Sequence, residues 1–225
     1  MKRSEINRII ENAKAFLAEK QFFLPPWAYW GPDEWKANKL DTEEITENML
    51  GWDITDFGSG DFYACGLFLF TIRNGKLGID LKPYAEKIMI VEENQVTPMH
   101  YHWSKMEDII NRGGGNLVIE LYNSDSESRF DLKPVIFKTD GVHRSVPAGG
   151  KVVLTPGESI CLEQGVYHKF YGETGKGKVL VGEVSMVNDD ASDNRFYEKV
   201  GRFPRIDEDE QPVHLLVGDY AHFLQ

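Results

Sequence analysis

This sequence has little cysteine, and it lacks long hydrophobic runs and an excess of basic residues. Its 225 residues include two cysteines, Cys65 and Cys161, and because both lie in apolar strand-like stretches we expect small buried side chains rather than a disulfide framework. This cysteine usage fits a reducing compartment. No apolar run approaches the length of a membrane span, and the charged N-terminus lacks the apolar core of a secretory signal. We therefore expect a cytoplasmic protein with no membrane partner.

The charge balance argues against nucleic-acid binding. Lysine and arginine together number 25, against 36 aspartates and glutamates, which gives a formal net charge of -11. Phosphate backbones repel a surface of this sign, so we expect no nucleic-acid partner.

Short strand-like runs separated by turns fill the middle of the chain, and helical periodicity is confined to its ends. Residues 4–20 place apolar side chains at spacings of three and four, which predicts an amphipathic helix docked on the body. The aromatic segment 22–35 is expected to wrap the body, and packing is favoured over lining a sugar pocket. The sequence predicts one structural domain, with an N-terminal helical and aromatic extension (1–60), an antiparallel barrel or jelly roll (61–187) and a C-terminal loop or cap (188–225).

One turn in the barrel region has a specific signature. The strand predicted over 62–72 is followed by Asn74 and Gly75, a pair that favours a two-residue hairpin turn. The segment 76–82 is then expected to return as the next strand.

A cluster of metal-ligand residue types stands out in the middle of the chain. His100 and His102 are two residues apart in a strand-like run, so both imidazoles leave the same face of the strand. A bend after Trp103 would bring the carboxylate of Glu107 to the same point. His168, in the strand-like run VYHKFY after a glycine turn, is a plausible fourth ligand.

This pattern, H-x-H-x4-E-x6-G followed by PGES and G-x2-H, resembles the two motifs of the cupin family. Metal-binding cupins hold a divalent ion with three histidines and one carboxylate inside a β-barrel. The resemblance therefore implies an all-β fold, a cupin-type antiparallel β-barrel or jelly roll with an N-terminal helical extension.

Further segments along nearly the whole chain resemble the bacterial D-lyxose isomerase family, a sugar isomerase branch of the cupins. They are LPPWAYWGPDEW, GWDITDFGSGDF, TIRNGK, KPYAEKIMIVEENQVTPMHYHWSKMEDIINRGGG and GEVSMVNDD with DNRFYE. The resemblance implies interconversion of D-lyxose with D-xylulose, with D-mannose and D-fructose as a slower pair. It also implies a homodimer and a divalent metal, commonly Mn2+, at His100, His102, Glu107 and His168; Zn2+, Co2+ and Fe2+ accept the same ligand types.

The implied chemistry agrees with these residue types. Moving a carbonyl from C1 to C2 of a sugar requires a proton transfer between the two carbons, through a metal-bound cis-enediolate whose charge must be held. A divalent cation with three nitrogen ligands and one oxygen ligand keeps positions open for the sugar oxygens O1 and O2, and acts as Lewis acid and template. A metal-assisted hydride shift is an alternative that the sequence does not decide against.

Five further residues are candidates for the reaction. Lys105, between two ligands, is expected to stabilise charge or protonate an oxygen, and the alternative is an exposed loop lysine. Glu183 stands in an apolar run, where an ionised carboxylate needs a reason to be buried, and is the candidate base. Lys87 is a candidate contact to a sugar hydroxyl, or else a solvated lysine at a strand end. Asp193 and Arg195 are candidate contacts to distal hydroxyls, or else a surface ion pair.

Two other functions are alternatives for a chain of this fold, and the first of them shares the ligand set. One is an iron-dependent cupin dioxygenase, and the other is a cupin that binds sugar without catalysis. The polar, charged cap argues against the apolar substrate of a dioxygenase, and an intact ligand set disfavours a protein that needs no metal.

Overall fold

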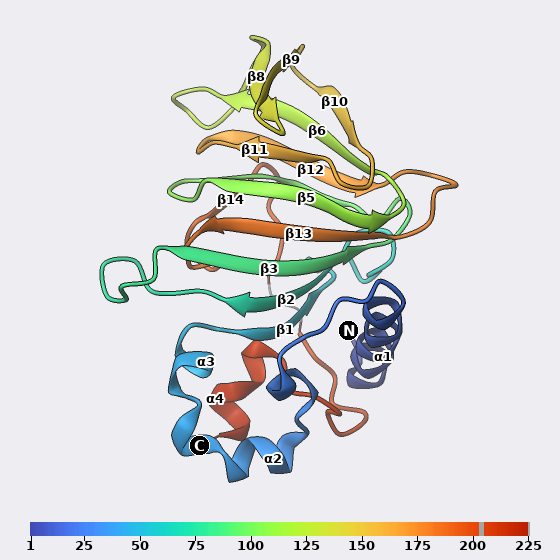
Figure 1. Cartoon of the computed structure of the whole chain (residues 1–225), viewed down its shortest axis with the longest axis vertical. Helices are drawn as coiled ribbons and strands as arrows, with labels where there is room; N and C mark the ends of the chain where they lie inside the picture. Colours follow the sequence, from blue (N-terminus) through green and yellow to red (C-terminus); the bar gives the residue numbers. More distant parts are fainter. Residues whose placement is uncertain (203–204, 225) are drawn as a thin grey trace.

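A computed structural model describes residues 1–202 and 205–224, which form antiparallel sheets with helices gathered at one end (Figure 1). The described residues build a larger sheet of eight strands. Its order is β1 (Gly51–Thr55), β2 (Leu67–Arg73), β3 (Tyr84–Val91), β13 (Val179–Met186), β5 (Glu107–Gly114), β11 (Ser159–Leu162), β8 (Val135–Thr139) and β9 (Val142–Val146).

The second sheet carries most of the predicted metal ligands. Its order is β10 (Gly150–Leu154), β6 (Leu117–Ser124), β12 (Val166–Gly172), β4 (Thr97–His102) and β14 (Asn194–Phe196), and the short β7 (Phe130–Asp131) pairs with β6. Apolar side chains from both sheets meet in one core, for example Met89 and Ile109 from the larger sheet and Leu121 from the smaller. Face-to-face burial of this kind drives closure of the two sheets. The predicted cupin-type antiparallel barrel with an N-terminal helical extension is confirmed.

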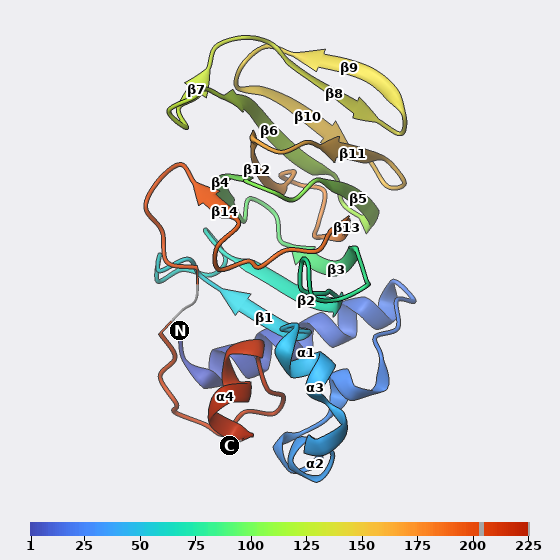
Figure 2. The same cartoon turned by 90° about the vertical axis from the view of Figure 1, so that its left-hand side faces the viewer.

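The helices cover the end of the larger sheet near β1. Helix α1 (Arg3–Glu19) buries Ile6, Ile10 and Leu17 in a second core that includes Trp52 and Phe70. The remaining helices are η1 (Pro26–Tyr29), α2 (Pro32–Ala37), η2 (Lys39–Asp41), α3 (Glu43–Glu47), η3 (Val217–Asp219) and α4 (Tyr220–Phe223). Both chain ends lie at this helical end, away from β8 and β9 (Figure 2). Within 1–202 and 205–224, no helix is long and apolar enough to cross a membrane.

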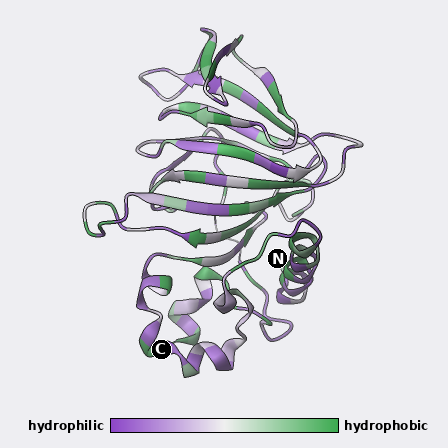
Figure 3. Cartoon of the chain, in the orientation of Figure 1, coloured by the Kyte–Doolittle hydropathy of each residue, from purple (hydrophilic) through white to green (hydrophobic). Residues whose placement is uncertain are grey.

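The aromatic segment packs as the sequence predicted. The Trp35 ring lies 5.0 Å from that of Tyr220 in α4, and the Trp27 ring stacks 5.2 Å from that of Phe70 in β2 (centroid to centroid). Hydrophobic and hydrophilic residues are interspersed along the strands (Figure 3). The segment therefore joins the terminal helices to the barrel.

The hairpin predicted at Asn74 and Gly75 is wrong. Strand β2 ends at Arg73, turns and bends occupy 76–82, and β3 begins at Tyr84. A type I′ turn needs positive φ at both central residues, and neither Asn74 nor Gly75 has it. Instead, the buried Asn74 amide donates a hydrogen bond to the carbonyl of Asn188, 2.9 Å away, so a long-range contact replaces the local turn.

Two strands also lie outside the range 61–187 predicted for the barrel. β1, at 51–55, pairs with β2, and β14, at 194–196, pairs with β4 beside the predicted ligands. The C-terminal segment therefore contributes a strand to the sheet that carries the histidines.

Candidate metal centre and active site

Pairing between β4 and β12 brings the predicted histidines together. His100 and His102 are two residues apart on β4, so their side chains share one face of the strand. His168 on β12 pairs directly with His100. The His100 and His168 rings lie 4.2 Å apart between centroids, and one nitrogen from each of the three imidazoles lies within 4.8 Å of the others. All three side chains are buried. Such a cluster could hold a metal ion.

Backbone carbonyls fix the orientation of two of these rings. Nδ1 of His100 lies 2.7 Å from the carbonyl oxygen of Pro98, and Nδ1 of His168 lies 3.0 Å from that of Val166. When Nδ1–H donates to the carbonyl, the lone pair is left on Nε2. An outer hydrogen bond of this kind is usual for histidines that bind metals.

The carboxylate of Glu107, the first residue of β5, reaches the same point. Its Oε1 lies 3.4 Å from Nε2 of His102 and 3.2 Å from Nε2 of His168. Nε2 of His168 and Nδ1 of His102 are buried and have no hydrogen-bond partner among the described residues. The orphaned Nε2 of His168 beside a carboxylate oxygen fits a divalent transition metal.

The protonation states suit a metal site. Burial, together with the neighbouring imidazoles of His168 and His102, holds the pKa of His100 well below its usual value, so its ring is neutral. Burial would raise the pKa of Glu107, but the ammonium of Lys105 and the ring of His102 outweigh it and hold that pKa well below the usual range. Neutral imidazole and ionised carboxylate are the forms that bind metal.

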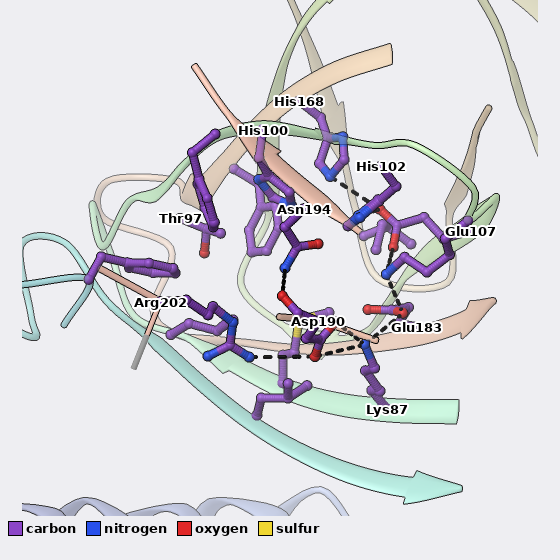
Figure 4. Close-up of a pocket in the computed structure, with 18 residues that line it drawn as sticks. Lys87, Thr97, His100, His102, Glu107, His168, Glu183, Asp190, Asn194 and Arg202 are labelled. Carbon is purple, nitrogen blue, oxygen red and sulfur yellow. Dashed lines mark hydrogen bonds and ion pairs between the residues drawn. The ribbon is translucent and has the colours of Figure 1, made fainter. Parts of the chain in front are cut away.

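A buried row of alternating charges extends from Glu107 (Figure 4). The ammonium of Lys105 lies 2.7 Å from Oε2 of Glu107 and 2.8 Å from Oε1 of Glu183 on β13. Oε1 of Glu183 also accepts a hydrogen bond from the Ser185 hydroxyl (2.9 Å) and lies 3.5 Å from the ammonium of Lys87. Both lysines are almost wholly buried, so neither is a solvated surface lysine. Burial lowers the pKa of Lys105, but the surrounding carboxylates raise it above its usual value, so the side chain is a cation.

The C-terminal segment supplies site residues that the sequence did not reveal. Asp190 accepts a hydrogen bond from Lys87 at 3.0 Å. The guanidinium of Arg202 lies 2.6 Å from a carboxylate oxygen of Asp53 and 3.5 Å from one of Asp190. No motif marks these residues, because only the pairing of β14 with β4 brings the segment over the site.

The sugar contacts predicted at Asp193 and Arg195 stay predictions, and the structure shows which groups of the protein these side chains bind. The carboxylate of Asp193 accepts hydrogen bonds from the backbone N–H groups of Ser104 (2.8 Å) and Lys105 (3.2 Å), so it holds the turn that carries Lys105. The guanidinium of Arg195 donates to the carbonyl of Phe196. Among the described residues, neither lines the pocket around the histidines, but Asp193 lines a larger cavity beside it.

We call this pocket the histidine pocket. Its polar lining consists of Lys87, Thr97, His100, His102, Lys105, Glu107, His168, Glu183, Asp190, Asn194 and Arg202. Its volume of about 40 Å³ is room for a few water molecules, and a larger cavity of about 680 Å³ lies beside it. Lys87 and Asp190 line both spaces, so a larger polar ligand could extend from one into the other.

Comparison with known proteins identifies the family. A family model described as D-lyxose isomerase matches residues 1–220. A D-lyxose/D-mannose isomerase from Serratia proteamaculans is 48% identical over 100% of both chains, and one from Escherichia coli O157:H7 is 49% identical over 99% of this chain and 100% of its own. In fold, the chain is similar to a Cellulomonas parahominis L-ribose isomerase solved with L-ribose (TM-score 0.58, 15% identity, 92% of this chain and 98% of that one). This chain therefore belongs to the D-lyxose isomerase family of sugar isomerases.

Proposed function

We propose that this protein interconverts D-lyxose and D-xylulose, and also D-mannose and D-fructose, with a divalent metal held by His100, His102, Glu107 and His168. Mn2+ is the metal we propose first, because the family resemblance implies it; Zn2+, Co2+ and Fe2+ accept the same ligand types. The observation that carries the proposal is the buried Lys105–Glu183 pair, 2.8 Å apart, directly beside neutral imidazoles and an ionised carboxylate in a member of this family.

The ligands and the catalytic groups have separate tasks. A bound divalent cation supplies Lewis-acid polarisation of the sugar carbonyl. The three histidines and Glu107, all buried, would hold it in the histidine pocket. Asp193 fixes the turn between β4 and β5, and thereby the position of Lys105.

Glu183 is the proposed base. In the aldose-to-ketose direction its carboxylate takes the proton from C2, which leaves a cis-enediolate, and returns a proton to C1. Lys105 is a cation beside it and stabilises the negative charge that develops on the sugar oxygens, while the proton of the O2 hydroxyl passes to O1. The hydrogen bond from Ser185 keeps the carboxylate of Glu183 in one orientation.

The lining of the pocket favours a polyhydroxy substrate. Lys87, Glu183 and Asp190 would lose hydration without compensation against an apolar ligand, whereas sugar hydroxyls donate and accept hydrogen bonds. This argues for a sugar over the apolar substrate of an iron-dependent dioxygenase.

Turnover in deuterated water tests the proposal. Metal-free protein is reconstituted with Mn2+, incubated with D-lyxose in D2O and followed by NMR. We expect D-xylulose carrying deuterium at C1, because a carboxylate base exchanges its proton with solvent. Failure to convert D-lyxose or D-mannose would overturn the proposed function, and turnover without any deuterium would remove the proton path through Glu183. Oxygen uptake by the Fe2+-loaded protein is the parallel measurement for a dioxygenase.

A further inference from the structure

Two buried polar atoms of the histidine pocket have no role in the chemistry described above. The hydroxyl oxygen Oγ1 of Thr97 and the amide oxygen Oδ1 of Asn194 both lack a hydrogen-bond partner within the described part of the chain. Thr97 is 2% exposed, and both residues line the pocket. Leaving a buried polar atom unpaired costs stability, so such atoms indicate a missing partner.

A strand irregularity aims Thr97 at the pocket. On a regular strand, Thr97 and His100, three residues apart, would point to opposite faces. Here His168 pairs with His100 and Phe170 pairs with Thr97. The two paired positions are three residues apart on β4 but two residues apart on β12, so β4 has one extra residue between them. This bulge turns the Thr97 side chain to the face that carries the imidazoles.

A hydrogen bond from Nδ2 fixes the side-chain amide of Asn194 and leaves its oxygen, Oδ1, without a hydrogen-bond partner among the described residues. Nδ2 donates to the backbone carbonyl of Asp190 at 3.0 Å, and the pairing of Asn194 with His102 places the residue directly beside the ligand strand. Oδ1 accepts hydrogen bonds but cannot donate them. A ligand group at this point must therefore be a donor, such as a hydroxyl.

We propose that Thr97 and Asn194 bind the hydroxyls of the sugar beyond the reacting carbons C1 and C2, and so take part in substrate selection. The inference rests on the proposed function, which places C1 and C2 near Glu183 and Lys105. Figure 4 shows Thr97 on the side of the pocket away from Glu183, with Asn194 between them. A sugar that reacts at Glu183 thus extends its remaining hydroxyls toward these two side chains.

Matched substitutions test the role of Thr97. Thr97→Val removes the hydroxyl at nearly constant shape, and Thr97→Ser keeps it. The control is Thr42→Val, because Thr42 is similarly buried but its hydroxyl donates a hydrogen bond to the backbone carbonyl of Lys39 (3.2 Å), and neither residue lines the histidine pocket or the larger cavity. The readouts are kcat/KM for D-lyxose and the thermal midpoint of the metal-free protein.

Opposite responses are expected from the two valine variants. Thr97→Val should lower kcat/KM roughly 2- to 12-fold, because the substrate loses one hydrogen bond to an uncharged group. Its thermal midpoint should stay equal or rise, because the substitution removes a buried hydroxyl that has no partner among the described residues. Thr97→Ser should stay within about twofold of wild type. Thr42→Val should lower the midpoint, because the Lys39 carbonyl loses its donor, and should leave kcat/KM unchanged.

Deoxy analogues of D-lyxose locate the contact. The effect of Thr97→Val on kcat/KM should disappear with an analogue that lacks the hydroxyl bound by Thr97 and persist with the others. Unchanged kcat/KM in Thr97→Val, or a lowered thermal midpoint like that of Thr42→Val, overturns this inference and leaves the proposed function standing. A wild-type protein that isomerises no aldose overturns both.

Discussion

Replacing Lys105 by methionine tests whether one ammonium holds two buried carboxylates together. Its Nζ lies 2.7 Å from Glu107 and 2.8 Å from Glu183, and the three side chains are 2%, 2% and 6% exposed. Removing one partner from a buried ion pair costs about 3–5 kcal/mol, because the remaining charge stays desolvated and unpaired. We expect a loss of this size in the free energy of unfolding of the metal-free variant near neutral pH.

Urea unfolding, followed by circular dichroism, measures this loss. The matched control is Lys76→Met, which removes a surface ion pair with Glu47 whose side chains are 35% and 51% exposed, and which should cost no more than about 1 kcal/mol. In Lys105→Met, burial raises the pKa of Glu107 without the opposing ammonium. The deficit should therefore shrink as pH falls and the carboxyl becomes neutral.

Adding Mn2+ supplies a second test of the same arrangement. A cation that binds the folded state beside Glu107 stabilises it by mass action, so Mn2+ should recover part of the lost stability. A loss in Lys105→Met no larger than that of Lys76→Met would refute the reasoning, since it would mean that the two carboxylates do not depend on this ammonium.

Two other substitutions probe the same row of charges. Glu183→Gln should lower kcat by about 10²- to 10⁴-fold with a folded circular dichroism spectrum, and activity near that of wild type would contradict its role as base. Burial opposes ionisation of Asp190, but Lys87 and Arg202 hold its pKa well below the usual value. Asp190 therefore stabilises the fold above its unfolded pKa of about 3.9, and the contribution is lost as pH falls through the lower folded pKa. The difference in unfolding free energy between wild type and Asp190→Asn should shrink below about pH 4; a difference independent of pH would be evidence against this pairing.

The sequence predicted those parts of the site that depend on residues close together in the chain. The i, i+2 spacing of His100 and His102 sets both rings on one face of β4, as the structure shows. The strand-like run VYHKFY after a glycine turn made His168 a plausible fourth ligand, and the resemblance to a family supported it; its position depends on the pairing of β12 with β4. Antiparallel strands were predictable for the same reason, because the alternation of apolar and polar residues and the turn residues both lie within short stretches of sequence.

Long-range contacts explain what the sequence did not predict. Asn74 forms no hairpin because its amide bonds to Asn188, 114 positions away. Asp190 and Arg202 reach the pocket through the pairing of β14 with β4, and the Thr97 side chain turns inward only because of a bulge between two distant strands. The homodimer and the cytoplasmic location stay predictions.

Titration of activity with Mn2+ tests the central claim most directly. Metal-free protein should be inactive toward D-lyxose, and activity should rise in proportion to added Mn2+ and stop at one equivalent per chain. His168→Ala should lose this response, whereas His143→Ala, an exposed residue of β9, should keep it. Equal activity without metal, or an unchanged titration in His168→Ala, would contradict a metal centre built on these histidines.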